Sequence, residues 1–286
     1  MKNRLFLFCS MIALVESNAQ TFHAGLFAGA SAYNGDLVTG IFPKQLTNGA
    51  AGITGNYEIS EQVLLRAGVT YSILGGADRY SPDTHLVRRN LSFETTLWEF
   101  QLVGEYYLFN LYERKYSPYV FAGAALFRFN PYAYTVNQQQ VYLQPLSTEG
   151  QGVPGYNIKP YKLTQLGIPF GGGIKYAFTD DLRLGVEFGL RKLFTDYLDD
   201  VSRNYADRNE LLTAKGQLAV DMAYRGDELP GGNAQYPQKG AQRGSPKSSD
   251  YYYFAGLHFS FRLGNGGGGF PIFNGRGKYG CPTVPQ

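Results

Sequence analysis

Alternating apolar and polar residues mark the last long segment of the chain, which reads YYYFAGLHFSFRL over residues 251–263. Its apolar face carries Tyr251, Tyr253, Ala255, Leu257, Phe259, Phe261 and Leu263, and its polar face includes His258, Ser260 and Arg262. A two-residue period predicts a β-strand with one apolar and one polar face. The segment is long enough to cross a bilayer, for which about 9–11 residues of strand suffice.

The same alternation recurs along the chain. It is clear in VLLRAGVTYSI (63–73), LWEFQLVGEYYL (97–108) and LRLGVEFGLR (182–191). Weaker versions occupy residues 22–33, 50–59, 118–129 and 164–177. With the segment at 251–263, these patterns predict eight strands.

The predicted connections alternate between short and long. Short turns lie near residues 60–62, 112–117 and 179–181, and long polar loops cover 34–48, 76–90, 131–160 and 196–250. This asymmetry is typical of outer-membrane barrels, whose long loops are extracellular. We therefore predict an all-β fold, an eight-stranded antiparallel transmembrane β-barrel over residues 20–263. The first and last strands should both bring their chain ends to the periplasmic side. Helical spacing within 207–225 predicts a short helix over the barrel mouth.

A soluble sandwich or lipocalin-like barrel is the alternative, because its apolar face points inward and periodicity alone does not fix the direction. The N-terminus favours the membrane. Residues 1–19, MKNRLFLFCSMIALVESNA, combine a basic start with a short apolar stretch and read as a secretory signal peptide cut after Ala19. The composition, with Gly 36, Tyr 23 and Phe 20, suits many two-faced strands.

The membrane orientation predicts a set of charged side chains inside the barrel, which we call the lumen charge network. Its members lie on the polar faces of the predicted strands: Arg66, Glu99, Glu105, Lys175, Arg183, Glu187, Arg191 and Arg262. Both signs of charge occur, so the members can pair with one another. Side chains fill a barrel of this size, so no wide pore is expected.

Evidence for catalysis in the sequence is weak. His258 and Ser260 share one strand face, and a His-x-Ser pair occurs in some outer-membrane lipid A deacylases. Both fall in the lumen phase, whereas acyl-chain chemistry needs them on the lipid side, so a lumen hydrogen-bond role is favoured. His23 and His85 are isolated in the sequence. We predict a non-enzymatic protein without metal or cofactor, and the formal charge of +3 does not indicate nucleic-acid binding.

An acidic segment follows the seventh predicted strand. TDYLDDVS, residues 195–202, places Asp196, Asp199 and Asp200 at the predicted outer rim. Such oxygen-rich loops can bind calcium. The spacing matches no defined calcium loop, which favours a solvated cap of the strand.

The end of the chain, residues 264–286, reads as a flexible periplasmic tail. GNGGGG makes its first part flexible, and Phe270, Phe273 and Tyr279 are apolar candidates for binding a partner. Cys281 is the only cysteine left after removal of the signal peptide, because the other is Cys9. An unpaired cysteine in an exported protein indicates an intermolecular disulfide or an exposed thiol.

Three segments resemble one family. GLFAGASAYNGDL (25–37), TDYLDDVS (195–202) and KYGCP (278–282) are similar, in this order, to motifs of the PorG-like outer-membrane protein of the type IX secretion system, which exports proteins and supports gliding in the Bacteroidota. The resemblance implies a barrel that anchors a periplasmic ring of the PorK lipoprotein and PorN to the outer membrane. The alternative is a small-molecule or lipid-binding barrel.

Overall fold

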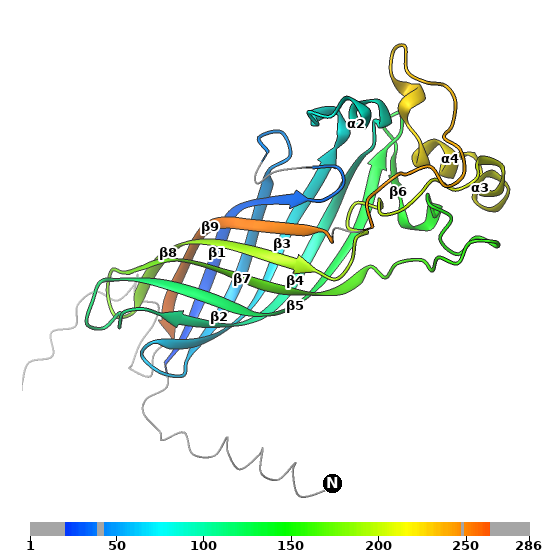
Figure 1. Ribbon diagram of the computed structural model, residues 1–286. Coiled ribbons are helices and arrows are strands. Elements are labelled where there is room, and N and C mark those ends of the chain that lie inside the picture. The colour runs from blue at the N-terminus through cyan, green and yellow to red at the C-terminus, as the bar shows by residue number, and fades with distance from the viewer. Residues whose placement is uncertain (1–20, 39–42, 247–248, 264–286) are drawn as a thin grey trace, which may run out of the picture.

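The barrel closes through antiparallel pairing of every strand with its neighbours (Figure 1). The computed structural model describes residues 21–38, 43–246 and 249–263. Its barrel strands are β1 (Phe22–Asn34), β2 (Asn48–Glu58), β3 (Val63–Ala77), β4 (Ser92–Tyr107), β5 (Tyr116–Tyr134), β7 (Thr164–Ala177), β8 (Leu182–Leu193) and β9 (Tyr251–Leu263). β4 pairs with β5 and β1 pairs with β9, which confirms the eight-stranded barrel.

Three tight connections join strands at one end of the barrel, which we call the short-turn end. In the turn between β7 and β8, the hydroxyl oxygen of Thr179 accepts the backbone N–H groups of Asp181 and Leu182 at 3.2 and 3.0 Å. In the turn between β2 and β3, the backbone N–H of Val63 donates to the Ser60 hydroxyl at 3.1 Å. Hydroxyl side chains therefore set these turns, as their local hydrogen bonding favours.

The long connections gather at the other end (Figure 1), and we call their described residues the cap. The cap comprises the described residues within 35–47, 78–91, 135–163 and 194–250. It contains β6 (Gln140–Tyr142), α2 (Thr84–Arg89), α3 (Arg208–Lys215), α4 (Gln217–Ala223) and the 3-10 turns η2 (Asp78–Tyr80), η3 (Gln144–Leu146) and η4 (Gly226–Glu228). Helices α3 and α4 confirm the helix predicted within 207–225. No helix among the described residues is long and apolar enough to cross a membrane.

The outer face of the barrel is apolar. Every barrel strand contributes exposed apolar side chains to this face. They include Leu26, Ile53, Leu65, Tyr71, Phe100, Leu102, Val120, Leu126, Leu166, Ile174, Val186 and Leu257. The inward side chains of the same strands include buried charges. A soluble barrel has the opposite arrangement, so this surface is one that lipid covers.

Two apolar clusters close the inside of the barrel. The larger one joins inward strand residues such as Phe127, Phe129 and Phe254 to the cap residues Leu198 and Met222. The smaller one packs at the short-turn end and consists of Leu64, Val103, Tyr107, Leu111, Tyr119, Phe121 and Ala177. The lumen charges therefore lie among apolar side chains, and the pair nearest the short-turn end, Arg183 and Glu58, is level with Ala177 and Leu64 of the smaller cluster.

Candidate functional site in the lumen and the cap

The centre of the lumen is a buried ion pair between strands on opposite sides of the barrel. Arg66 on β3 contacts Glu187 on β8 through Nη1–Oε2 at 2.5 Å and Nη2–Oε1 at 3.2 Å. Its Nε atom lies 2.9 Å from Oε1 of Glu105 on β4. Alternation carries all three side chains inward. Gly189 on β8 leaves room for Arg191 and Phe121, because a Cβ there would meet the Arg191 guanidinium and lie 2.8 Å from the Phe121 ring. One guanidinium thus bridges two carboxylates across the lumen.

Lys175 and two tyrosines complete this central group. The Lys175 ammonium lies 3.2 Å from Oε2 of Glu105 and over the rings of Tyr107 and Tyr119, at 5.3 and 5.0 Å from their centroids. The Tyr107 hydroxyl donates to Glu105 at 2.6 Å, and the Tyr119 hydroxyl donates to Glu187 at 2.7 Å. Charge-assisted hydrogen bonds of this kind offset part of the cost of burying the ions.

A second group lies nearer the cap. Arg191 contacts Glu99 through two nitrogens, each 3.2 Å from a carboxylate oxygen. The Tyr252 hydroxyl donates to the same carboxylate at 2.5 Å, and the Arg191 guanidinium lies 4.3 Å from the ring centroid of Phe254. The pair is therefore enclosed by aromatic rings.

A third group lies toward the short-turn end. Arg183 contacts Glu58 at 2.7 Å, and the Tyr112 hydroxyl donates to Glu58 at 2.6 Å. Arg262, predicted inside the lumen, lies at the rim with 26% of its side chain exposed and contacts Asp181 at 3.4 Å. Sequence reasoning missed Glu58, although the alternation of Thr54, Asn56 and Glu58 in β2 gave the signal.

The buried strand charges balance. Four cations, Arg66, Lys175, Arg183 and Arg191, face four carboxylates, Glu58, Glu99, Glu105 and Glu187. A void between Arg66, Glu187, Arg191 and His258 measures about 10 Å³. One water needs roughly 10–15 Å³. The central lumen is therefore filled with paired side chains.

His258 and Ser260 both lie inside the barrel and are buried. The Nε2 atom of His258 lies 2.8 Å from the Thr54 hydroxyl. Neither side chain faces the lipid, as their strand phase predicts. His23 also points inward, and its Nδ1 atom lies 3.9 Å from Glu58, so it is less isolated in space than in sequence.

Two buried arginines connect the loops of the cap. Arg89 pairs with Asp78 through two contacts of 2.7 Å and donates to the backbone carbonyls of Asp36, at 3.1 Å, and Arg243. Arg243 donates to Glu149 at 3.1 Å and to the Asp200 carbonyl at 2.6 Å. Four separate loops are thus joined by these side chains.

The segment TDYLDDVS differs from the predicted solvated cap, because its last two aspartates are buried. Asp199 accepts the Tyr33 hydroxyl at 2.5 Å, while Asp200 accepts the hydroxyls of Thr148 and Tyr161 at 2.6 and 2.7 Å. The carboxylates turn to different partners instead of converging on a calcium ion. Packing causes this burial: the neighbouring Leu198 and Val201 insert into the larger apolar cluster and carry the aspartates inside.

Burial changes the acidity of this segment. It raises the pKa of Asp200 to about 6, although the Arg243 guanidinium lowers it. It also raises the pKa of Asp196 to about 7, with nearby Asp36 and Glu149 adding to the effect. Burial and the charge of Asp250 raise the pKa of Asp199 well above its usual range. The segment therefore retains protons at pH values where a solvated aspartate has lost them.

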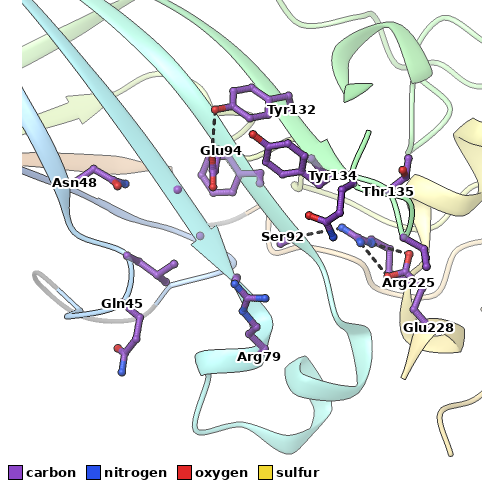
Figure 2. A pocket seen from close by; sticks show the side chains of 18 residues that line it. Gln45, Asn48, Arg79, Ser92, Glu94, Tyr132, Tyr134, Thr135, Arg225 and Glu228 are labelled. Atoms are coloured by element: carbon purple, nitrogen blue, oxygen red, sulfur yellow. Dashed lines mark hydrogen bonds and ion pairs between the residues drawn. The ribbon is translucent and has the colours of Figure 1, made fainter. Parts of the chain in front are cut away.

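A cavity of about 540 Å³ opens beside the cap, and we call it the flank pocket. Its side chains come from the loop before β2, from η2, β4, β5 and the turn η4 (Figure 2). Glu94 accepts the Tyr132 hydroxyl at 2.9 Å, and Arg225 contacts Glu228 and Ser92. Sequence patterns gave no sign of it, because loops far apart in the chain form its walls.

The predicted partner-binding residues Phe270, Phe273, Tyr279 and Cys281 lie outside the described residues, as does the predicted signal peptide. Within the described part of the chain, no group of three or more His, Cys, Asp or Glu side chains could hold a metal ion.

Solved structures with a similar fold are bacterial barrels. Neisserial surface protein A is 11% identical with a TM-score of 0.42, over 85% of this chain and 99% of that chain. The Ail protein of Yersinia pestis is 7% identical with a TM-score of 0.39, over 85% and 97%. The outer membrane protein OprG of Pseudomonas aeruginosa is 10% identical with a TM-score of 0.35, over 85% and 94%. At these values the likenesses carry no functional argument.

Sequence comparison gives the family. No curated protein matches the chain. A family model described as a domain of unknown function, DUF6089, matches residues 2–224, which is most of the chain. The protein therefore belongs to the DUF6089 family.

Proposed function

We propose that this protein is an integral outer-membrane barrel that acts by binding other proteins at its ends. The observation that carries the proposal is the filled lumen, in which four buried cations pair with four buried carboxylates among the side chains of two apolar clusters. A filled lumen leaves no path for a solute, so the surfaces outside it must supply the function. The long loops are extracellular and the short turns periplasmic in this proposal, because outer-membrane barrels have that asymmetry.

More specifically, we infer a non-enzymatic role in type IX protein secretion. The segments at 25–37, 195–202 and 278–282 support this role through their resemblance to PorG-like proteins. The barrel would anchor the periplasmic ring of PorK-like and PorN-like proteins at the outer membrane, and the tail at 264–286 would contact the ring. The buried positions of Asp199 and Asp200 give the segment at 195–202 a structural role in the cap.

The two alternatives have less support. A conduit for small apolar compounds needs open space in the lumen, where the void beside Arg66 and Arg191 measures about 10 Å³. A lipid hydrolase built on His258 and Ser260 needs both groups at the lipid face, whereas both are buried inside the barrel.

Crosslinking tests the proposal in living cells. The barrel is purified after crosslinking, and the proteins attached to it are identified by mass spectrometry. Recovery of periplasmic ring proteins supports the anchor. Recovery of only barrel and lipid, from cells in which the ring is assembled, contradicts it.

A further inference from the structure

The flank pocket lies on the outward face of the barrel, beyond the lipid-facing belt. Tyr71 on β3 and Trp98 on β4 form an exposed aromatic pair with ring centroids 5.0 Å apart. Such residues mark the membrane–water interface. Glu94 precedes Trp98 by four residues on β4, which is about 13 Å along the strand at roughly 3.3 Å per residue. The pocket therefore lies at the level of lipid headgroups.

Its walls are held in place by contacts among themselves. Tyr132 is buried, donates to Glu94 and packs edge-on against Tyr134, with ring centroids 5.8 Å apart and an angle of 90°. Arg225 is fixed by two contacts of 2.9 Å to Glu228 and by one of 3.1 Å to Ser92. The side chains are thus ordered before any ligand arrives.

One backbone feature at the rim adds to this order. Gln138 has a φ of 60°, in the left-handed region that side chains other than glycine rarely adopt. Turn hydrogen bonds of 2.9 Å from Gln138 N–H to the Thr135 carbonyl and from Thr135 N–H to the Gln139 carbonyl hold it there. Such backbone conformations cluster at functional sites.

The charges of the pocket indicate a neutral ligand. Two guanidinium groups, Arg79 and Arg225, are matched by two carboxylates, Glu94 and Glu228, so the formal charge is 2 − 2 = 0. Arg225 is already paired, which leaves no cluster of cations for a phosphate. The amides Gln45, Asn48 and Gln138 and the hydroxyl of Thr135 add uncharged donors and acceptors.

Tyr134 supplies the apolar part of the site. This residue is 39% exposed and lines the pocket beside these polar groups. Hydrogen-bonding groups around an exposed aromatic ring suit a sugar, which has hydroxyls at its edges and C–H groups on its faces. The cavity of about 540 Å³ falls in the usual range for small-molecule sites, about 300–1,000 Å³.

We propose that the flank pocket binds one or two neutral sugar units of a saccharide. The sugar could belong to a glycolipid headgroup or to a free oligosaccharide, and the recognition chemistry is the same. Binding of a glycolipid headgroup depends on the orientation in the proposed function, which puts the cap at the outer leaflet. Binding of a free oligosaccharide does not depend on that orientation.

The test measures saccharide affinity with the full chain purified in detergent micelles. The probe is the core oligosaccharide released by mild acid from lipopolysaccharide of the cells that express the protein. Inorganic phosphate is the anion control. Tyr134→Ala removes the exposed ring. Gly75→Val places a side chain in the pocket, because a Cβ at Gly75 lies 3.2 Å from the Phe93 carbonyl oxygen and 3.5 Å from Cγ of Glu94. We expect each variant to weaken oligosaccharide binding at least tenfold.

Tyr142→Ala is the matched control. Tyr142 is 48% exposed on the same hairpin and packs against Tyr132, but it does not line the pocket. Its variant should bind the oligosaccharide as the wild type does. Unchanged binding by both Tyr134→Ala and Gly75→Val would overturn the proposal, as would binding of phosphate with the same sensitivity to these variants.

A second arm identifies the source of the sugar. Intact lipopolysaccharide in nanodiscs is compared with the free oligosaccharide. Binding of both supports a glycolipid headgroup, and binding of the free oligosaccharide alone supports a soluble saccharide. Binding of neither probe overturns the proposal. These titrations contain no periplasmic protein, so their failure leaves the ring-anchor proposal standing.

Discussion

Arg66 and Glu187 meet across the barrel lumen through two contacts of 2.5 and 3.2 Å, although they are 121 positions apart in the chain. They lie on β3 and β8, which are not neighbours in the sheet. Their pairing therefore connects opposite walls of the barrel. This distinguishes it from the strand hydrogen bonds, which connect each wall only to the next.

Replacing Glu187 with Leu should destabilise the barrel. The change removes one of the two carboxylates that contact Arg66 and the acceptor of the Tyr119 hydroxyl. Breaking a buried pair costs about 3–5 kcal/mol, and we expect the lower end because Glu105 remains beside Arg66. Urea titrations of the barrel in detergent, with the folded fraction read from gel mobility, measure the change in the free energy of unfolding.

Two further variants control this experiment. Glu187→Gln keeps an acceptor for Tyr119 and should lose less stability. Val186→Ala changes the adjacent, lipid-facing residue and should move the midpoint little. An unchanged midpoint in Glu187→Leu would show that the pair adds no net stability.

Chemical labelling should separate the two faces of the strands. Phe188 and Leu257 are 42% and 51% exposed on the outer face, whereas Glu105 and Glu187 are buried in the lumen. Single-cysteine variants at 188 and 257, in a Cys281→Ser background, should react with a lipid-soluble maleimide in liposomes. Variants at 105 and 187 should not, and preferential reaction there would mean that the strands face the opposite way.

The strands and their phase were predictable because each follows a two-residue period that the barrel imposes. Arg66, Glu105, Glu187 and Arg191 could be placed in the lumen from alternation alone. Their pairing could not be predicted, because it depends on which strands face each other across a closed sheet. Asp199 and Asp200 were misjudged for a related reason: loop packing has no period, and the inserted apolar residues carried them inside.

Rising pH should loosen the cap around Asp196. Burial raises the pKa of this carboxyl from 3.8 to about 7, so the folded cap holds a proton that the opened segment releases. The resulting stability is present below pH 4 and is lost as the pH rises to about 7. Hydrogen exchange of residues 194–203, corrected for intrinsic rates, should show more frequent opening at pH 8 than at pH 5.

Substitution of Asp196 tests whether its carboxyl causes the more frequent opening at high pH. Asp196→Asn removes one of the titrating groups and should reduce the dependence on pH, while Asp199 and Asp200, whose pKa values burial also raises, keep the remainder. Asp221→Asn, at an exposed aspartate of α4, should leave the dependence on pH as in the wild type. Equal protection of the wild type at both pH values would contradict the role given to Asp196.

Deleting residues 270–286 should remove the periplasmic ring proteins from the purified barrel and impair secretion, because the tail is proposed to bind the ring. Cys281→Ser separates the two modes of attachment: on non-reducing gels it abolishes a disulfide-linked species but leaves aromatic docking intact. If the deletion leaves both co-purification and secretion unaltered, the tail has no anchoring role.

The central claim is that the lumen is filled, so that the protein works at its surfaces. Planar-bilayer recording of the purified wild-type barrel tests this claim directly. Because paired charges and two apolar clusters fill the lumen, we expect no stepwise ionic current at potentials that leave the bilayer intact. Stable, reproducible channel openings by the wild-type protein would contradict it.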